Sequence, residues 1–162
     1  MNTPLGWFTA FHTLLSFVAI GAGLVAIRDI MQGRTRSGAI TVFLATAILT
    51  SVTGFFFPYH GPTPAIAVGV IALVVLGWAV YARRSAGRPG FAGAQFPIGI
   101  VISQYFLVFV LVAQIFAKLP VLTALPQDLQ KKLFGATELV VLVAFVVLAV
   151  RATRAFRLRA AA

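Results

Sequence analysis

Long runs of apolar residues without charge dominate this sequence and leave little choice of fold. A helix needs about 20 residues to cross a hydrocarbon core about 30 Å thick, because each residue adds about 1.5 Å. The runs that meet or approach this length cover residues 4–27, 38–57, 63–82, 96–117 and 133–150. The sequence therefore predicts an all-α, integral membrane bundle of five transmembrane helices, which forms a single transmembrane domain over residues 1–162.

Composition supports a membrane protein and excludes several other classes. Of the residues, 60% are hydrophobic and only 10% are charged, whereas about a quarter of the residues in a soluble domain are charged. The chain has no cysteine, so it has no disulfide, no thiolate metal site and no cysteine nucleophile. A secretory signal requires basic residues before its apolar stretch. Residues 1–4 contain no lysine or arginine, so we expect the first apolar run to stay as a membrane helix.

Basic residues divide unequally between the two sides of a five-helix membrane bundle. Lysine and arginine are retained on the cytoplasmic side of a membrane. Only Lys118, Lys131 and Lys132 fall on one side. The residues on the other side are Arg28, Arg34, Arg36, Arg83, Arg84, Arg88, Arg151, Arg154, Arg157 and Arg159. The sequence therefore predicts a multi-pass protein of the cell inner membrane, with its N-terminus outside and its C-terminus inside. A four-span alternative would place a basic loop or the arginine tail outside.

The positive charge could also indicate nucleic-acid binding, since the net charge is +10. Its position argues otherwise, because the basic residues cluster at the ends of the apolar runs, as topology signals do. We therefore expect the partner to be the lipid bilayer and not nucleic acid, with a membrane-protein partner or a homo-oligomer as further candidates. The basic tail over 151–162 is expected to lie at the anionic surface of the cytoplasmic leaflet.

A proline-flanked segment, residues 58–62, joins the second and third apolar runs. It is so short that the two helices must be adjacent and antiparallel, forming a transmembrane hairpin. Small residues recur at helix-packing spacing, which allows helix backbones to approach closely. They are Ala19 with Gly23, Ala22 with Ala26, and Ala65 with Gly69.

Glu138 is the most informative single residue, because a carboxylate in hydrocarbon is costly unless it is paired, hydrated or neutral. The 13 residues from Glu138 to Arg151 extend only about 20 Å along a helix, which is too short to cross the membrane core. The span must therefore begin before Glu138. This places the carboxylate within the outer leaflet.

Polar residues from other segments fall at a similar depth, about 21–27 Å from the inner boundary by the same helical rise. They are His12, Thr50, Thr53 and Gln114, with His60 just above them in the hairpin loop. The faces that carry His12, Thr50 and Thr53 should look inward, because lipid would leave these polar groups without partners. The sequence therefore predicts a polar layer in the outer half of the bundle.

Two interpretations of this layer remain open. A histidine and a carboxylate at one depth can exchange a proton, and the same groups can form a pocket for a small solute, a lipid head group or a quinone head group. In the alternative interpretation, these groups form hydrogen bonds that only fix helix packing, and the Glu138 side chain extends to Lys131 or Lys132. Ser103, Gln104 and Tyr105 lie deeper in the fourth run. We expect their side chains only to form hydrogen bonds with neighbouring helices.

Catalytic and cofactor signatures are missing from the sequence. The candidate metal ligands of the outer half, His12, His60 and Glu138, have no metal-binding spacing, and His60 lies in a loop that does not suit a bis-histidine haem. There is no phosphate-cradling loop, no zinc-protease motif and no nucleophile elbow. We therefore expect no cofactor, no metal and a non-enzymatic role. An accessory subunit of a larger membrane complex is the alternative, and an enzyme acting on lipid is a third.

The stretch from Thr50 to Gly61 and the run from Tyr105 to Leu125 resemble bacterial inner-membrane proteins without an assigned activity. The first two apolar runs, with the Gly-Arg-Thr-Arg-Ser-Gly loop over 33–38, are similar to a widespread bacterial membrane family catalogued as a domain of unknown function. That wider family often carries histidines where Arg36 and Ala65 stand here. The resemblance implies a polytopic membrane fold and no particular activity.

Overall fold

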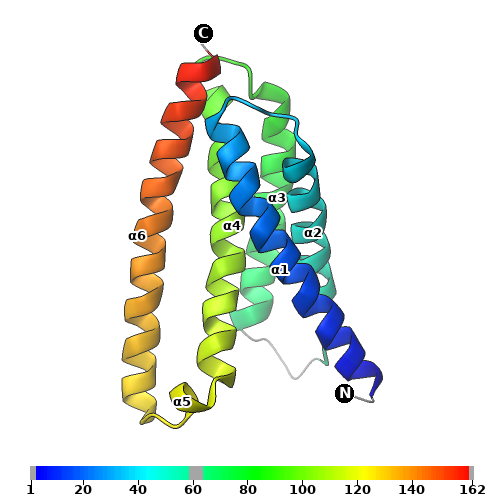
Figure 1. Cartoon of the computed structure of the whole chain (residues 1–162), viewed down its shortest axis with the longest axis vertical. Helices are drawn as coiled ribbons and strands as arrows, with labels where there is room; N and C mark the ends of the chain where they lie inside the picture. The colour runs from blue at the N-terminus through cyan, green and yellow to red at the C-terminus, as the bar shows by residue number, and fades with distance from the viewer. Residues whose placement is uncertain (1–2, 59–63, 161–162) are drawn as a thin grey trace.

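Helices make up nearly all of the computed structural model, which describes residues 3–58 and 64–160 (Figure 1). No strand occurs within these ranges, so the all-α prediction is confirmed for them. His60 lies outside the described residues. The helices are α1 (Pro4–Met31), α2 (Gly38–Gly54), α3 (Pro64–Ala82), the 3₁₀ turn η1 (Arg83–Ser85), α4 (Phe91–Lys118), α5 (Pro120–Thr123) and α6 (Gln127–Ala160).

Four of these helices are long and apolar enough to cross a membrane, as expected of a multi-pass membrane protein. The membrane-length segments in the described residues are Pro4–Met31, Ile66–Ser85, Phe91–Lys118 and Gln127–Arg159. Helix α2 is apolar but has only 17 residues, or about 26 Å of helix. It ends three residues before the predicted boundary at 57.

Capping side chains set where α1 and α2 begin. The Thr3 hydroxyl accepts a hydrogen bond from the Gly6 amide at 3.2 Å, and Pro4 follows at the first helical position. The Ser37 hydroxyl accepts from the Ile40 amide at 3.2 Å in the same way. Such caps satisfy amide groups that have no partner within the helix. Gly33, with φ of 79°, lets the chain turn between the two helices.

Helices α1 and α4 form the centre of the bundle. Helix α1 contacts α2, α4 and α6, while α4 also contacts α3, α5 and α6. Helix α2 packs against α3, which confirms that the two helices of the predicted hairpin are neighbours, and they run in opposite directions (Figure 1). Helix α6 stands at one edge of the bundle, beside α4.

The contact between the two central helices is built around a buried amide. Gln104 of α4 is 0% exposed, and its Nε2 donates to the Ile20 carbonyl of α1 at 3.0 Å. Gly23 makes room for it, because a Cβ there would clash with the Gln104 amide and stand 2.8 Å from Cδ2 of Phe43. Gly99 plays the same part between α4 and α3, where a Cβ would stand 2.8 Å from the Cβ of Ala79. The predicted close approach at Gly23 is therefore confirmed.

Helix α6 continues well beyond the predicted inner boundary at 150. The structure places residues 151–160 in the same helix, instead of in a separate tail. Ala152 and Phe156 are buried in the hydrophobic core with residues such as Ile27 and Ile30 of α1. They lie four residues apart on one helical face, so an apolar stripe runs through the arginine-rich segment and holds it against the bundle.

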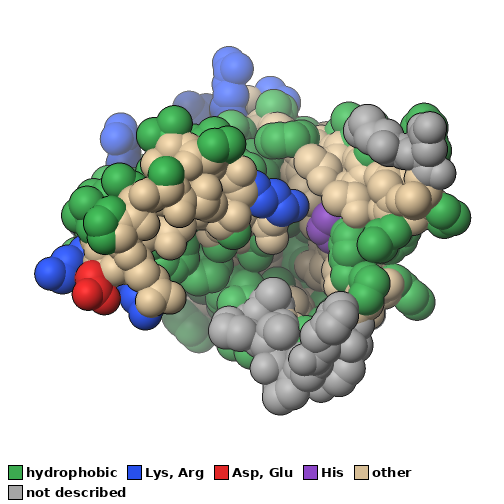
Figure 2. Space-filling view, turned by 90° about the horizontal axis from the view of Figure 1, so that it is seen from below, with side chains coloured by type: hydrophobic (Ala, Val, Ile, Leu, Met, Phe, Trp, Pro, Cys, Tyr) green, Lys and Arg blue, Asp and Glu red, His purple; other side chains and the backbone are tan. Residues whose placement is uncertain are grey.

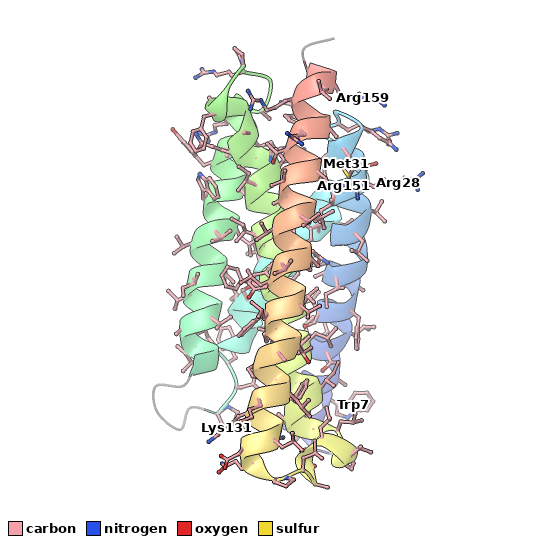
Figure 3. The ribbon with its side chains drawn as sticks, turned by 90° about the vertical axis from the view of Figure 1, so that its left-hand side faces the viewer. Trp7, Arg28, Met31, Lys131, Arg151 and Arg159 are labelled. Carbon is pink, nitrogen blue, oxygen red and sulfur yellow. The ribbon has the colours of Figure 1, made fainter. Side chains whose placement is uncertain are left out.

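Charged residues separate towards the two ends of the bundle. Arg28, Arg151 and Arg159 lie towards one end, whereas Trp7 and Lys131 lie towards the other (Figure 3). We call these the arginine end and the lysine end. The separation agrees with the unequal charge distribution found in the sequence.

Replacing Gly23 by alanine should destabilise the bundle by about 1–3 kcal/mol, the usual effect of overpacking a buried site. The added Cβ must displace Gln104, which breaks its hydrogen bond to Ile20, or Phe43, which is fully buried. The free energy of unfolding in mixed micelles measures the change. Gly21→Ala is the matched control, because no atom lies within 4 Å of a Cβ there, and it should be neutral or slightly stabilising. Equal effects at the two positions would contradict the packing assigned to Gly23.

Candidate polar site at the lysine end

His12 of α1 forms a cross-helix contact with the end of α2. Its Nδ1 lies 2.9 Å from the Oγ1 of Thr53. The ring of Phe57 packs edge-on against the imidazole, with the ring centroids 5.1 Å apart. A histidine side chain is visible from the lysine end, in a hollow among the helix ends (Figure 2). The predicted inward orientation of His12 and Thr53 is therefore seen in a direct hydrogen bond.

The hydrogen bonds of Thr53 favour one tautomer of His12. The Thr53 hydroxyl lies 2.7 Å from the Leu49 carbonyl and 3.1 Å from the Thr50 carbonyl. A hydroxyl has one proton to donate, and a carbonyl can only accept it. Because the Thr53 hydroxyl donates its proton to a backbone carbonyl, its oxygen accepts a hydrogen bond from Nδ1–H of His12. The other ring nitrogen, Nε2, then remains an acceptor in the neutral imidazole.

Thr50 lies one turn deeper in α2 and has a different environment. Its side chain is buried, and its hydroxyl makes no hydrogen bond within the described residues. Thr46, a further turn inward, instead donates to its own helix, at the carbonyls of Val42 and Phe43. Thr50 therefore leaves an uncompensated polar group on the buried side of α2.

Glu138 is buried between α6 and α4 without an internal partner. Its side chain is 8% exposed, and neither carboxyl oxygen has a hydrogen-bond partner within the described residues. The polar group that interacts with it electrostatically is the Tyr105 hydroxyl on α4. A buried carboxylate without a donor is costly, so this site requires a proton, a cation or a donor group from outside the described residues.

Aromatic rings surround this stretch of the α4–α6 interface. On α4, Tyr105 contacts Phe145 of α6, with ring centroids 5.7 Å apart. Phe109 and Phe116 contact Phe134 of α6, at 6.3 and 5.6 Å. Glu138 follows Phe134 by four residues and precedes Phe145 by seven, so all three lie on one helical face. We call this group of rings the aromatic seam, and Glu138 lies within it.

The structure brings together only some of the residues predicted for the polar layer. His12 and Thr53 meet, but no hydrogen bond or ion pair joins Glu138 to His12 within the described ranges. The predicted alternative, a contact from Glu138 to Lys131 or Lys132, is not formed either. The outer layer therefore contains two separate polar centres.

Gln114 does not extend a polar path into the bundle. It is exposed on α4, whereas Ser103 is buried and donates to the Gly99 carbonyl of its own helix at 2.8 Å, and not to a neighbouring helix as predicted. The buried residues of α4 all lie between Gly93 and Gln104, so Gln114 lies beyond the buried part of this helix.

Two neighbours of the site were missed by reasoning from the sequence. Tyr105 interacts electrostatically with Glu138, and Lys118 interacts electrostatically with His12. The predicted hydrogen bond from Gln104 to a neighbouring helix is confirmed, because its amide donates to Ile20 of α1. Tyr105 and Phe109, four residues apart, were a signal for an aromatic face on α4. Nothing in the spacing indicated that this face would pack against Glu138.

No protein-family model, curated protein or solved structure matches the chain.

Thr53→Val should lower the free energy of unfolding by about 1 kcal/mol more than Thr46→Val, because it also removes the acceptor for His12. Both changes delete a hydroxyl that bonds to carbonyls of its own helix, so Thr46→Val is the matched control. Nitrogen NMR of the imidazole should show the Nδ1–H tautomer in the parent protein and a shift in the tautomer mixture in Thr53→Val. An unchanged imidazole spectrum would rule out the assigned contact.

Proposed function

We propose that the chain is a non-enzymatic protein of the cell inner membrane that crosses the bilayer five times and binds a proton at Glu138 in its outer half. The N-terminus is outside and the arginine end faces the cytoplasm. One observation carries the functional part of this proposal. The carboxyl group of Glu138 is buried in an aromatic seam, and no described side chain or backbone group bonds to it.

The arrangement of the helices supports five crossings. Helix α2 is the shortest of the long helices, but it runs between the same two ends of the bundle as α1 and α3 (Figure 1). Arg28, Arg151 and Arg159 gather towards the end where α1 and α6 finish (Figure 3). Because arginine is retained on the cytoplasmic side of a membrane, this end of the bundle is expected to face the cytoplasm.

Single cysteines test this topology, because the chain has no cysteine of its own. Thr3→Cys, Gly87→Cys and Asp128→Cys each place a thiol at an exposed position outside the apolar segments. An impermeant maleimide added to intact cells should label Cys at 3 and 128 but not at 87, and permeabilised cells should show all three labelled. If α2 did not cross, positions 3 and 128 would lie on opposite sides, since only three crossings would separate them. Labelling of one of these two positions alone therefore contradicts five spans.

A proton is the ligand that best fits the surroundings of Glu138. The carboxyl group needs a partner, yet it lies where rings of α4 and α6 pack closely together. A proton needs no cavity, whereas a solute or head group would have to part the two helices. The Tyr105 hydroxyl is close enough to interact electrostatically and provides a polar neighbour for proton transfer.

His12 provides a second titratable group towards the same end of the bundle. Its Nδ1 bonds to Thr53, and its Nε2 makes no hydrogen bond within the described residues. No direct contact links it to Glu138, so transfer between them requires water or a substrate. A small solute, lipid head group or quinone head group that donates a hydrogen bond could lie between His12 and Glu138. Binding of such a molecule is the second candidate function of this polar layer.

The alternative function is that of an accessory subunit in a larger membrane complex. Helix α6 favours this alternative, because one side of it exposes a continuous set of branched apolar side chains. They are Leu139, Val140, Leu142, Val143, Val146, Val147 and Val150. Such a surface suits either lipid or another membrane helix, and a second copy of the chain or a different protein could cover it.

Glu138→Gln tests the proton site, with Asp128→Asn as the matched control for exchanging a carboxyl group for an amide at an exposed position. Infrared difference spectra of the parent protein in lipid nanodiscs should show a protonated carboxyl that titrates with pH. This signal should persist in Asp128→Asn and vanish in Glu138→Gln. Proteoliposomes with an imposed membrane potential should lose at least tenfold of their proton flux in Glu138→Gln.

The possible results separate the candidate functions. A carboxyl group that stays ionised at every pH overturns the proton-binding proposal, and a parent protein that moves protons no faster than empty liposomes overturns any role of Glu138 in proton transfer across the membrane. If Glu138→Gln folds, keeps its proton flux and loses only co-purifying membrane proteins, the accessory role is supported instead.

A further inference from the structure

A hollow lined by three arginines lies at the arginine end of the bundle, between the start of α2 and the end of α3. Its volume is about 270 Å³, and its walls are formed by Arg36, Val80, Arg83 and Arg84. This is several times the roughly 30 Å³ that one water molecule occupies in the liquid. The hollow is separate from the polar layer at the lysine end.

The positive charge around this hollow is not neutralised within the chain. The protein has three acidic side chains. Asp29 pairs with Arg34 at 3.0 Å, Asp128 lies in the first turn of α6, and Glu138 is in the aromatic seam. None of them forms an ion pair with Arg36, Arg83 or Arg84 in the described residues. Three like charges at one hollow repel one another, so an anion from outside would relieve the repulsion.

Arg83 is held in place by the loop that joins α1 and α2. Its Nε donates to the Thr35 carbonyl at 2.9 Å. This bond uses only Nε, so the two terminal amino groups of the guanidinium remain available to a ligand. They make no hydrogen bond to other described residues. Paired amino groups match the geometry of two phosphate oxygens. A positioned guanidinium loses less conformational freedom when it binds a ligand.

The surface next to the hollow is apolar and aromatic. Val80 is 45% exposed and Tyr81 is 67% exposed, and the Arg84 guanidinium stacks 5.6 Å from the centre of the Tyr81 ring. Trp78 donates from its indole nitrogen to Gln95 of α4 at 3.1 Å. Aromatic residues with a polar edge are typical of the membrane–water interface. The hollow therefore joins a cationic wall to a surface suited to lipid chains.

We propose that this hollow binds the phosphate group of an anionic phospholipid, with the acyl chains lying along Val80 and Tyr81 of α3. Arg36, Arg83 and Arg84 contact the phosphate oxygens. Free phosphate could use the same three cations, but it has no group to cover the apolar surface beside them. The proposal concerns the leaflet at the arginine end, and it does not depend on proton binding at Glu138.

Lipid titration of the full-length protein in a neutral detergent tests this proposal. Native mass spectrometry counts the bound molecules of phosphatidylglycerol, of phosphatidylcholine as the zwitterionic comparison, and of inorganic phosphate. Arg36→Gln and Arg84→Gln remove charge from the hollow without removing any hydrogen bond within the described chain. Arg157→Gln is the matched control, since it removes one exposed positive charge at the same end. Arg83 is left intact because it also bonds to the loop at Thr35.

We expect the parent protein to bind phosphatidylglycerol at least tenfold more tightly than phosphatidylcholine. Arg36→Gln and Arg84→Gln should each weaken phosphatidylglycerol binding at least fivefold, whereas Arg157→Gln should change it less than twofold. Unfolding midpoints within the error of the parent protein show that the variants keep their fold.

Two results overturn the lipid site. If all three arginine variants weaken binding equally, the attraction comes from the overall charge of this end. If inorganic phosphate binds as tightly as phosphatidylglycerol, or displaces it at equal concentration, the ligand is a free phosphate. A variant that unfolds is replaced by the corresponding lysine variant, Arg36→Lys or Arg84→Lys. Each keeps the charge, so it should retain more binding than the glutamine variant does.

Discussion

The hydrogen bond from Gln104 to the Ile20 carbonyl lies at the centre of this bundle, and the arrangement of the other helices depends on it. Helices in lipid gain little from apolar burial, so close packing and hydrogen bonds between helices stabilise their contacts. Gly23 allows this contact, because the Gln104 amide occupies the space that a side chain there would fill. Around this pair, α2 and α6 pack on α1, while α3 and α6 pack on α4.

Buried polar groups of the bundle differ in whether they have a hydrogen-bond partner, and groups without one occur towards both ends, at Thr50, Gln104, Glu138 and Thr153 in the described residues. The Ser103 hydroxyl donates to the Gly99 carbonyl of its own helix, and the Trp78 indole donates to the side-chain amide oxygen of Gln95 on α4. Towards the lysine end, the Thr50 hydroxyl and both oxygens of Glu138 have no partner in the described residues. An unsatisfied polar group is costly in a low-dielectric interior. Of the groups without a partner, Glu138 is the one that can ionise, and this is the physical reason for proposing that it binds a proton.

Charge separation gives the two ends of the molecule different chemistry. The arginine end carries more positive charge than its few acidic neighbours can neutralise, and Asp29 is already engaged by Arg34. Arg36, Arg83 and Arg84 therefore have no acidic partner in the described residues. The lysine end has fewer charges, and much of its visible surface is apolar (Figure 2). The proposed proton site at one end and the proposed anionic-lipid site at the other are compatible, because no residue is shared between them.

The sequence by itself determined that the chain forms apolar helices, because the length of an uncharged run needed to cross a membrane is set by the helical rise. It also indicated the α2–α3 hairpin, the close approach at Gly23 and the burial of Glu138, since each follows from spacing along one or two segments. Only the tertiary structure decided that His12 pairs with Thr53 and that Tyr105 interacts electrostatically with Glu138. These outcomes depend on how each helix rotates about its axis against its neighbours. A depth calculated along a single helix contains no information about that rotation.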